Sequence, residues 1–296
     1  MKTTPRPYQA DAVRHALAAH DRGERLAYFS MPTGTGKSLV LAGVAQALTS
    51  RGRILAVVHR RELVEQLAAT LGRELAMPIA IAMGGRCPDR SARVVVGSVQ
   101  TFGNRTLGAL LVGSEVPIAA LLIDESHHVA RGNSYGILIA NVRAHSPSAF
   151  VLGCTATPAR STGGRMQDVL AACVFARRIP QMIDAGVLAP LSHRRVEVAF
   201  ALCPIRKARG DYAIGALDAA MIPSVVTATA RETAPMIGGR RSIAFCVSVR
   251  HAHELAHIYA TFGIRAAVVY GEQPRDQREA AIAAWRVGEL DVLTNV

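Results

Sequence analysis

The sequence MPTGTGKS, residues 31–38, lies between a short apolar run, LAYF (26–29), and a segment with helical spacing, SLVLAGVAQALT (38–49). Strand, glycine-rich turn and helix in that order are the usual context of the phosphate-binding loop G-x-x-x-x-G-K-[ST]. Only the first glycine of the pattern is replaced, by Met31. The sequence therefore predicts a loop that holds the phosphates of a nucleotide.

Each residue type in this loop suits that chemistry. Gly34 and Gly36 can adopt backbone conformations that turn successive N–H groups toward a phosphate. The Lys37 ammonium can reach the β- and γ-phosphates, the Ser38 hydroxyl can bind Mg²⁺, and the following helix adds the positive end of its dipole. The predicted nucleotide-binding residues of the loop are Thr33, Gly34, Thr35, Gly36, Lys37 and Ser38.

Short apolar runs alternate with helical patterns through the first half of the chain. After LAYF, the predicted strands are 54–58, 94–96, 119–123 and 150–153, and residues 62–75 predict a further helix. Alternating strands and helices indicate an α/β fold with a parallel sheet covered on both faces. In such sheets, ligands bind at the carboxyl ends of the strands.

The pattern changes after about residue 178. There, 179–190 predicts a short helix ending at Gly186, and RRVEVAF (194–200) alternates like a half-exposed strand. Later strands are predicted at 242–247, 264–270 and 291–296, with helices at 250–262 and 274–288. We expect an ATP-binding domain over 1–178, a linker and connecting segment over 179–235, and part of a second domain of the same kind over 236–296.

The stretch LLIDESHHV (121–129) places four side chains that can all bind metals almost side by side: Asp124, Glu125, His127 and His128. A zinc site is disfavoured, because adjacent residues at a strand end point in opposite directions and no cysteine pair completes the ligand set. A fold with a phosphate-binding loop instead places Asp124 as a second Mg²⁺ contact and Glu125 where it can polarise the attacking water. The two histidines are expected to contact neighbouring loops.

The chain is strongly basic, with a formal net charge of +12 and a pI of about 10.2. Lysine occurs only at Lys2, Lys37 and Lys207, so 31 of the 34 basic residues (34 − 3) are arginine. Arginine binds phosphate in a bidentate manner and stacks on bases, which favours a nucleic-acid partner. A coding bias toward arginine is the alternative explanation.

Several classes of protein are disfavoured by composition. No apolar run reaches the roughly 18 residues that a membrane helix needs, and the N-terminus lacks the apolar segment of a secretory signal. The five cysteines are scattered and form no C-x-x-C motif, which argues against a disulfide framework. We expect free thiols and a cytoplasmic protein.

The phosphate-binding loop, followed about 90 residues later by the Asp-Glu-x-His box, resembles the superfamily 2 helicases and translocases. The resemblance extends over essentially the whole chain and is greatest to RadD-like and type III restriction-type helicases. The motifs at 31–38, 124–127 and 155–158 are specific in combination. Those at 57–66, 97–101 and 243–252 are weak singly, and GSVQT (97–101) could be an ordinary strand-to-helix turn with Ser98 as N-cap.

The resemblance implies a role for each motif. Gln9 of RPYQ (6–9) would read adenine, and TATP (155–158) would link the nucleotide site to strand movement through Thr155 and Thr157. Segment 57–66 resembles motif Ia and 97–101 motif Ib, both of which touch the nucleic-acid backbone. The implied nucleic-acid contacts are Arg60, Ser98, Gln100 and Thr101. Segment 243–252 would begin a second RecA-like domain.

The function implied is an ATP-dependent nucleic-acid helicase or translocase; the residues do not choose between DNA and RNA, and the resemblance to RadD-like helicases favours DNA. Its cofactors would be ATP and Mg²⁺, with Ser38 and Asp124 as metal contacts and Glu125, Asp124 and Lys37 as catalytic residues. The family's motifs V and VI lie beyond the strand that ends at Val296, so we expect weak turnover and a further segment or second chain that completes the second domain. The rival functions are an ATP-gated nucleic-acid clamp and the motor portion of a restriction enzyme.

Overall fold

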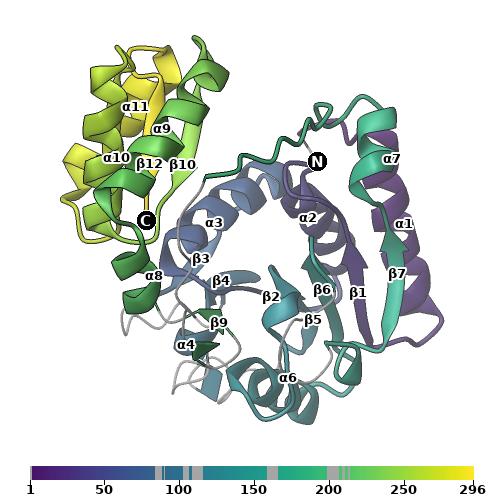
Figure 1. Cartoon of the computed structure of the whole chain (residues 1–296). Coiled ribbons are helices and arrows are strands. Elements are labelled where there is room, and N and C mark those ends of the chain that lie inside the picture. Colours follow the sequence, from purple (N-terminus) through teal and green to yellow (C-terminus); the bar gives the residue numbers. More distant parts are fainter. Residues whose placement is uncertain are drawn as a thin grey trace. The chain divides into compact units, whose positions relative to one another are not determined.

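The computed structural model describes residues 2–83, 89, 91–102, 107–108, 116–158, 166–198, 207–208, 211–212 and 214–296. The chain divides into two compact units, Met1–Pro190 (unit 1) and Leu191–Val296 (unit 2), shown in Figure 1. Within the described ranges, no helix combines the length and the apolar character needed to cross a membrane.

Unit 1 is built on a seven-stranded, wholly parallel sheet in the order β3-β4-β2-β5-β6-β1-β7. Its strands are β1 (Leu26–Ser30), β2 (Arg53–Val58), β3 (Ala80–Ala82), β4 (Val94–Ser98), β5 (Ile118–Ile123), β6 (Phe150–Thr155) and β7 (Ala172–Ala176). The five strands predicted in this unit are confirmed, and the two edge strands, β3 and β7, were not predicted. Parallel pairing brings all seven carboxyl ends to one edge of the sheet.

Helices cover both faces of this sheet, which confirms the predicted fold class. One face carries α1 (Pro7–Asp21), α2 (Lys37–Leu48) and α3 (Arg61–Leu75); the other carries α4 (Val99–Thr101) and α6 (Ser134–His145). Successive side chains of a strand point to opposite faces, so alternate residues of β2 enter different cores. Ile54, Ala56 and Val58 pack with the first group of helices, whereas Leu55 and Val57 join the second core.

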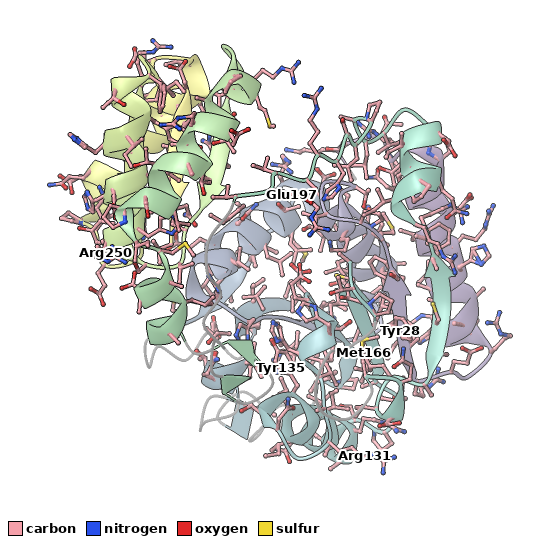
Figure 2. All side chains as sticks on the ribbon, in the orientation of Figure 1. Tyr28, Arg131, Tyr135, Met166, Glu197 and Arg250 are labelled. Carbon is pink, nitrogen blue, oxygen red and sulfur yellow. The ribbon has the colours of Figure 1, made fainter. Side chains whose placement is uncertain are left out.

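The second core includes Tyr28, Tyr135 and Met166, which are labelled in Figure 2. Its tightest point is Gly153 on β6. A Cβ added there would lie 2.6 Å from the Ser126 Cβ and 2.6 Å from a Leu170 methyl carbon. Because real Cβ atoms do not approach so closely, only glycine lets the turn that carries Ser126 pack directly on the strand.

The segment after β7 begins with α7 (Ile179–Asp184). The helix predicted over 179–190 is therefore confirmed in its first half, and Gly186, with φ 66°, follows its end. The strand predicted over 194–200 is wrong for residues 194–198, which pair with no strand; 199 and 200 lie outside the described residues. Arg195 and Glu197 are exposed and Val196 and Val198 are half-buried, so burial does alternate here without any strand pairing.

Unit 2 contains a three-stranded parallel sheet in the order β10-β12-β11 and a short antiparallel hairpin, β8-β9. Its strands are β8 (Lys207–Ala208), β9 (Asp211–Tyr212), β10 (Ser242–Phe245), β11 (Ala266–Val269) and β12 (Val292–Asn295). Its helices are α8 (Ile214–Ala220), α9 (Pro223–Ile237), α10 (Val249–Thr261) and α11 (Arg275–Val287). The three strands and two helices predicted here from residue 242 onward are confirmed, whereas the hairpin β8-β9 and the helices α8 and α9 were not predicted.

The core of unit 2 is small and comes mainly from α9, α10 and β12. Helix α11 has no buried residue, and its Trp285 indole N–H donates a hydrogen bond to the Ser242 carbonyl oxygen at 3.1 Å. An ion pair adds to these contacts. The Arg265 guanidinium donates to both carboxylate oxygens of Asp291, at 3.0 and 2.8 Å, and the Arg265 backbone N–H donates at 2.9 Å.

These bonds from Arg265 hold the pKa of Asp291 at about 2. An unfolded Asp has a pKa of about 3.9. A carboxylate whose folded pKa is depressed stabilises the fold above its unfolded pKa, and the contribution is lost as pH falls toward its folded pKa. The stabilisation from Asp291 is therefore present at neutral pH and disappears between about pH 4 and pH 2.

We predict that Asp291→Asn lowers the thermal unfolding midpoint of unit 2 at pH 7, and that the gap from the parent narrows as pH falls toward 2. Calorimetry at a series of pH values measures this difference. Glu272→Gln is the matched control, because Glu272 is an exposed carboxylate of unit 2 that forms no ion pair with a described residue. A gap of constant size across the series would contradict the assignment.

Candidate active site

The phosphate-binding loop has the backbone that its glycines predict. Gly34 and Gly36 have φ angles of 83° and 79°, in the left-handed region, and Lys37 begins α2. The Lys37 side chain is 9 % exposed and makes no ion pair with a described residue. Thr33 and Gly34 are exposed, whereas Thr35 is buried and donates from its hydroxyl to the Pro32 carbonyl oxygen.

Met31 stands where the loop pattern has its first glycine. Its side chain is fully buried in the first core, and its N–H donates to the Thr155 carbonyl oxygen at 3.0 Å. That bond continues the pairing of β1 with β6 by one residue. The departure from the pattern therefore extends strand β1 and leaves the following turn intact.

Gln9, on the first turn of α1, lies directly against the loop. Its side-chain oxygen accepts from the Arg6 N–H at 2.8 Å, and its nitrogen donates to the Thr35 carbonyl oxygen at 2.9 Å. A Cβ on Gly36 would lie 2.4 Å from that nitrogen, so a larger residue there would displace the Gln9 amide, and its φ of 79° independently favours glycine. Gln9 thus supports the loop, while a primary amide keeps one further donor and acceptor for a base.

A cavity of about 470 Å³ lies beside this helix start. It is lined by Arg6, Pro7, Tyr8, Asp11, Ala185, Gly186 and Val187. The Tyr8 hydroxyl also donates to the Thr35 carbonyl oxygen, at 2.9 Å, so one wall of the cavity is tied to the phosphate-binding loop.

Asp124 follows β5, and its N–H donates to the Val57 carbonyl oxygen at 2.9 Å. Its Oδ1 atom accepts from the Glu125 N–H at 2.9 Å and from the Cys154 thiol at 3.1 Å. The other carboxylate oxygen and the Ser38 hydroxyl have no hydrogen bond to a described residue. These are hard oxygen donors of the kind that Mg²⁺ takes from proteins, so the residues present fit that ion.

Glu125 is in the left-handed region, with φ 52° and ψ 49°, where among the described residues only Ala76 joins it as a non-glycine. Such a conformation costs about 1–3 kcal/mol and persists where the surroundings fix it. Here the fixing contacts are the bond from the Glu125 N–H to Asp124 and the following turn η2 (Ser126–His128), whose Ser126 is fully buried. The Glu125 side chain is 33 % exposed and can therefore contact water.

His127 connects the Asp-Glu-x-His box to the TATP segment. Its Nδ1 lies 3.2 Å from a Glu125 carboxylate oxygen and 3.1 Å from the Thr155 hydroxyl. That hydroxyl also accepts from the Thr157 N–H at 3.1 Å. The expected contact of this histidine with a neighbouring loop is confirmed.

The electrostatic effects on buried neighbours show that these charges converge. Burial raises the pKa of the Cys154 thiol, the nearby Asp124 and Glu125 charges raise it further, and the Lys37 charge opposes them. Burial, followed by Asp124 and Glu125, likewise raises the pKa of Tyr135. Sequence reasoning found neither Cys154 nor Tyr135, because nothing in their local spacing marks them as neighbours of the box.

The predicted nucleic-acid contacts lie at the ends of β2 and β4, and they differ in accessibility. Arg60 and Gln100 are exposed. Ser98 and Thr101 are buried, with hydroxyls 2.9 Å apart, and Ser98 caps α4 by accepting from the Thr101 N–H. The N-cap alternative for Ser98 is therefore confirmed.

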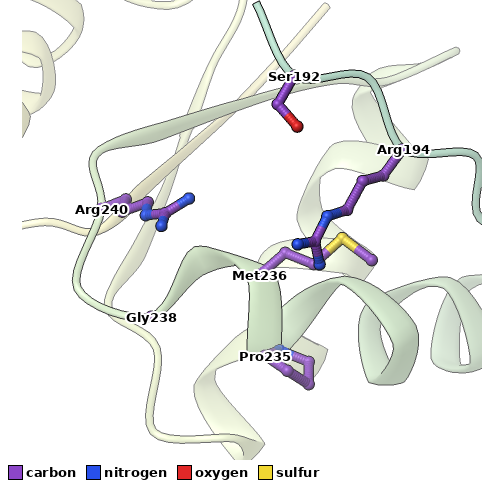
Figure 3. Close-up of a pocket in the computed structure, with 6 residues that line it drawn as sticks. All are labelled: Ser192, Arg194, Pro235, Met236, Gly238 and Arg240. Carbon is purple, nitrogen blue, oxygen red and sulfur yellow. The ribbon is translucent and has the colours of Figure 1, made fainter.

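Unit 2 contains a separate cavity of about 480 Å³, lined by Ser192, Arg194, Pro235, Met236, Gly238 and Arg240. Figure 3 shows the two arginine side chains extending into the same space. The cavity lies at the end of α9, and cations are stabilised beside the negative end of a helix dipole. The same dipole opposes a bound anion, so this pair of arginines is weak evidence for a phosphate site.

Comparisons with known proteins place unit 1 in a family. The family model for the type III restriction enzyme res subunit, ResIII, matches residues 2–160. IRC3 of Saccharomyces cerevisiae, named as an ATP-dependent helicase, is 26 % identical over 306 residues, covering 98 % of this chain and 44 % of that protein. A Schizosaccharomyces pombe protein named as a mitochondrial ATP-dependent helicase is 27 % identical over 304 residues, with 98 % and 48 % covered. The chain thus spans about half the length of these relatives.

Solved structures agree on the fold. A fragment of an HsdR subunit of a type I restriction enzyme from Vibrio vulnificus YJ016 gives a TM-score of 0.71 at 20 % identity, covering 98 % of this chain and 54 % of that one. The Hef helicase domain of Pyrococcus furiosus gives 0.63 at 15 % identity, with 98 % and 85 % covered. The family match extends over more than half of the chain, so the chain belongs to the type III restriction enzyme res subunit (ResIII) family of superfamily 2.

Proposed function

We propose that this chain binds ATP with Mg²⁺, hydrolyses it, and couples hydrolysis to movement on nucleic acid as a helicase or translocase. One observation carries the proposal: the phosphate-binding loop, Asp124, Glu125 and the His127–Thr155 contact all lie at the carboxyl edge of the unit 1 sheet. The relatives named as ATP-dependent helicases support the same reaction.

The proposed chemistry is in-line attack of a water on the γ-phosphorus, which breaks the bond to the β–γ bridging oxygen and yields ADP and phosphate. Lys37 binds the phosphate oxygens. Mg²⁺, held by Ser38 and Asp124, would neutralise charge on them. Glu125 orients the water and takes its proton, while the His127 Nδ1 atom contacts both the Glu125 carboxylate and the Thr155 hydroxyl.

The choice of Glu125 over Asp124 as the base follows from their contacts. Asp124 is already engaged at one oxygen by two donors, and its remaining oxygen is suited to the cation. The Glu125 carboxylate is partly exposed to solvent, and its one ion pair with a described residue is with His127. A group that accepts a proton from water needs that access.

A nucleic-acid partner is supported by the net charge of +12 and by the exposed Arg60 at the start of α3. No side chain caps this helix, so its first N–H groups and its dipole favour a phosphate beside Arg60. We propose Arg60 and Gln100 as side-chain contacts and the 98–101 turn as a backbone contact. DNA in a cytoplasmic setting is the proposed context, in keeping with the free thiols of Cys154, Cys173 and Cys246; Cys87 and Cys203 lie outside the described residues.

Lys37→Ala should lower the affinity for ATP and abolish hydrolysis, because it removes the ammonium that binds the phosphates. The fold should persist, since Lys37 makes no ion pair with a described residue. Nucleotide titration and circular dichroism measure the two effects. Lys2→Ala removes the same charge from an exposed position and should change neither; equal ATP affinity and turnover in Lys37→Ala and parent would refute the loop assignment.

The substitution Glu125→Gln distinguishes the hypothesis of an ATP-hydrolysing enzyme from that of an ATP-gated clamp. It should keep Mg²⁺-dependent ATP binding and lower the hydrolysis rate by about 100-fold or more, because a general base contributes roughly 10²–10⁴. Single-turnover hydrolysis with excess protein measures this even when turnover is slow. Glu65→Gln, on the exposed side of α3, is the control. A parent that binds both ATP and DNA but hydrolyses nothing would favour the clamp.

Arg60→Ala should weaken binding of a single-stranded oligonucleotide and lower the slope of log K against log salt by about 0.7, as expected for one lost phosphate contact. Fluorescence anisotropy across a salt series measures the slope. Arg240→Ala removes the same charge beside the end of α9 and should leave the slope unchanged. Equal slopes for parent and Arg60→Ala would place the nucleic acid elsewhere.

A further inference from the structure

Three aromatic rings form a nearly parallel cluster between the end of β2, turn η2 and the first turn of α6. The His59 and His128 rings stack with centroids 4.2 Å apart. Tyr135 lies 6.4 Å from His128 and 6.5 Å from His59, and all three interplanar angles are below 20°. Tyr135 is labelled in Figure 2. We call these three residues the ring cluster.

Packing alone does not explain the ring cluster. The Tyr135 hydroxyl and the His59 Nδ1 atom are buried without a hydrogen-bond partner among the described residues. Burying an unsatisfied polar atom costs about 1–3 kcal/mol, which apolar rings of the same shape would avoid. Buried polar groups without a hydrogen-bond partner therefore need an explanation other than stability. One explanation is that the site changes conformation.

The two adjacent histidines of η2 face different partners. His127 contacts Glu125 and Thr155 in the candidate active site, whereas His128 stacks on His59 of the ring cluster. Their own rings are 4.2 Å apart. Both belong to one three-residue turn that begins at the buried Ser126, so a movement of the His128 backbone also moves His127.

The other end of the ring cluster meets the proposed nucleic-acid edge. His59 directly precedes Arg60, the residue before α3. Since the Nδ1 atom of His59 makes no hydrogen bond to a described residue, the ring can move with the backbone of Arg60 without breaking one there. Asn133 stiffens the far side, because its side chain donates to the His128 carbonyl oxygen at 2.8 Å and caps α6, which carries Tyr135.

We propose that the His59–His128 stack is the positioning element that transmits nucleic-acid binding at Arg60 to Glu125. A phosphate at the start of α3 shifts Arg60 and His59, His128 follows the stacked ring, and turn η2 carries His127 with it. The contact between His127 and Glu125 then sets the carboxylate for attack by water. This inference rests on the proposed function and assigns its coupling to two residues outside the nucleotide-binding motifs.

The test follows the His127 ring directly. In protein labelled with ¹⁵N-histidine, a single-stranded oligonucleotide should shift the His127 ring resonances of the parent chain. His59→Leu and His128→Leu should abolish the shift while keeping the affinities for oligonucleotide and ATP within about twofold. In single-turnover assays, the oligonucleotide should raise the rate of ATP hydrolysis by the parent and leave that of His128→Leu at its basal value.

Two further variants test whether the effect depends on ring stacking or only on the volume of the side chain. His128→Phe keeps an aromatic ring and should restore the His127 shift. His15→Leu replaces a histidine that contacts Phe175, outside the ring cluster, and should behave as the parent. A merely structural role would predict that His128→Leu changes stability without a selective loss of the shift.

The outcomes distinguish this inference from the proposed function. If the oligonucleotide binds without shifting His127, or if the shift persists in both leucine variants, the coupling route is overturned while ATP hydrolysis and nucleic-acid binding stand. If the parent chain binds neither ATP nor the oligonucleotide, the proposed function fails, and this inference fails with it.

Discussion

The hydrogen bonding of β5 between β2 and β6 is the constraint on which the candidate site depends. Backbone pairing also continues past the strand ends. The Asp124 N–H donates to the Val57 carbonyl oxygen after β5, and the Met31 N–H donates to the Thr155 carbonyl oxygen after β1. These bonds hold the ends of four parallel strands at one level. A nucleotide loop, two carboxylates and a threonine hydroxyl from distant parts of the sequence are therefore brought together by backbone geometry before any side chain contributes.

The turn after β5 shows how that constraint shapes chemistry. Ser126 packs against Gly153 so closely that no side chain fits there, and the preceding residue, Glu125, lies in the left-handed region. The backbone strain thus falls on the residue that we propose orients the attacking water. The turn also gives the two histidines different partners: His127 contacts the Glu125 carboxylate, and His128 stacks on His59, directly after β2.

The sequence predicted the central strands well because their apolar runs are buried on both faces. It missed β7 although ACVFA (172–176) is apolar throughout; only Phe175 of its five residues is buried, as is usual for an edge strand. The strand predicted from the polar–apolar alternation at 194–200 was wrong for 194–198, because such a pattern forms a strand only where another strand pairs with it. Within the site, the loop and the Asp-Glu-x-His box were predictable from spacing. The support of the loop by Gln9 and the bond from Cys154 to Asp124 arise from tertiary packing, which no local pattern encodes.

The indole contact of Trp285 with Ser242 has an optical consequence. The chain has a single tryptophan, and it lies half-buried on α11 in unit 2. Emission excited at wavelengths that tyrosine does not absorb therefore reports on unit 2 alone, whereas helical ellipticity sums over both units. Recording the two signals during one denaturant titration resolves whether the units unfold together or in sequence, with no label attached and no residue replaced.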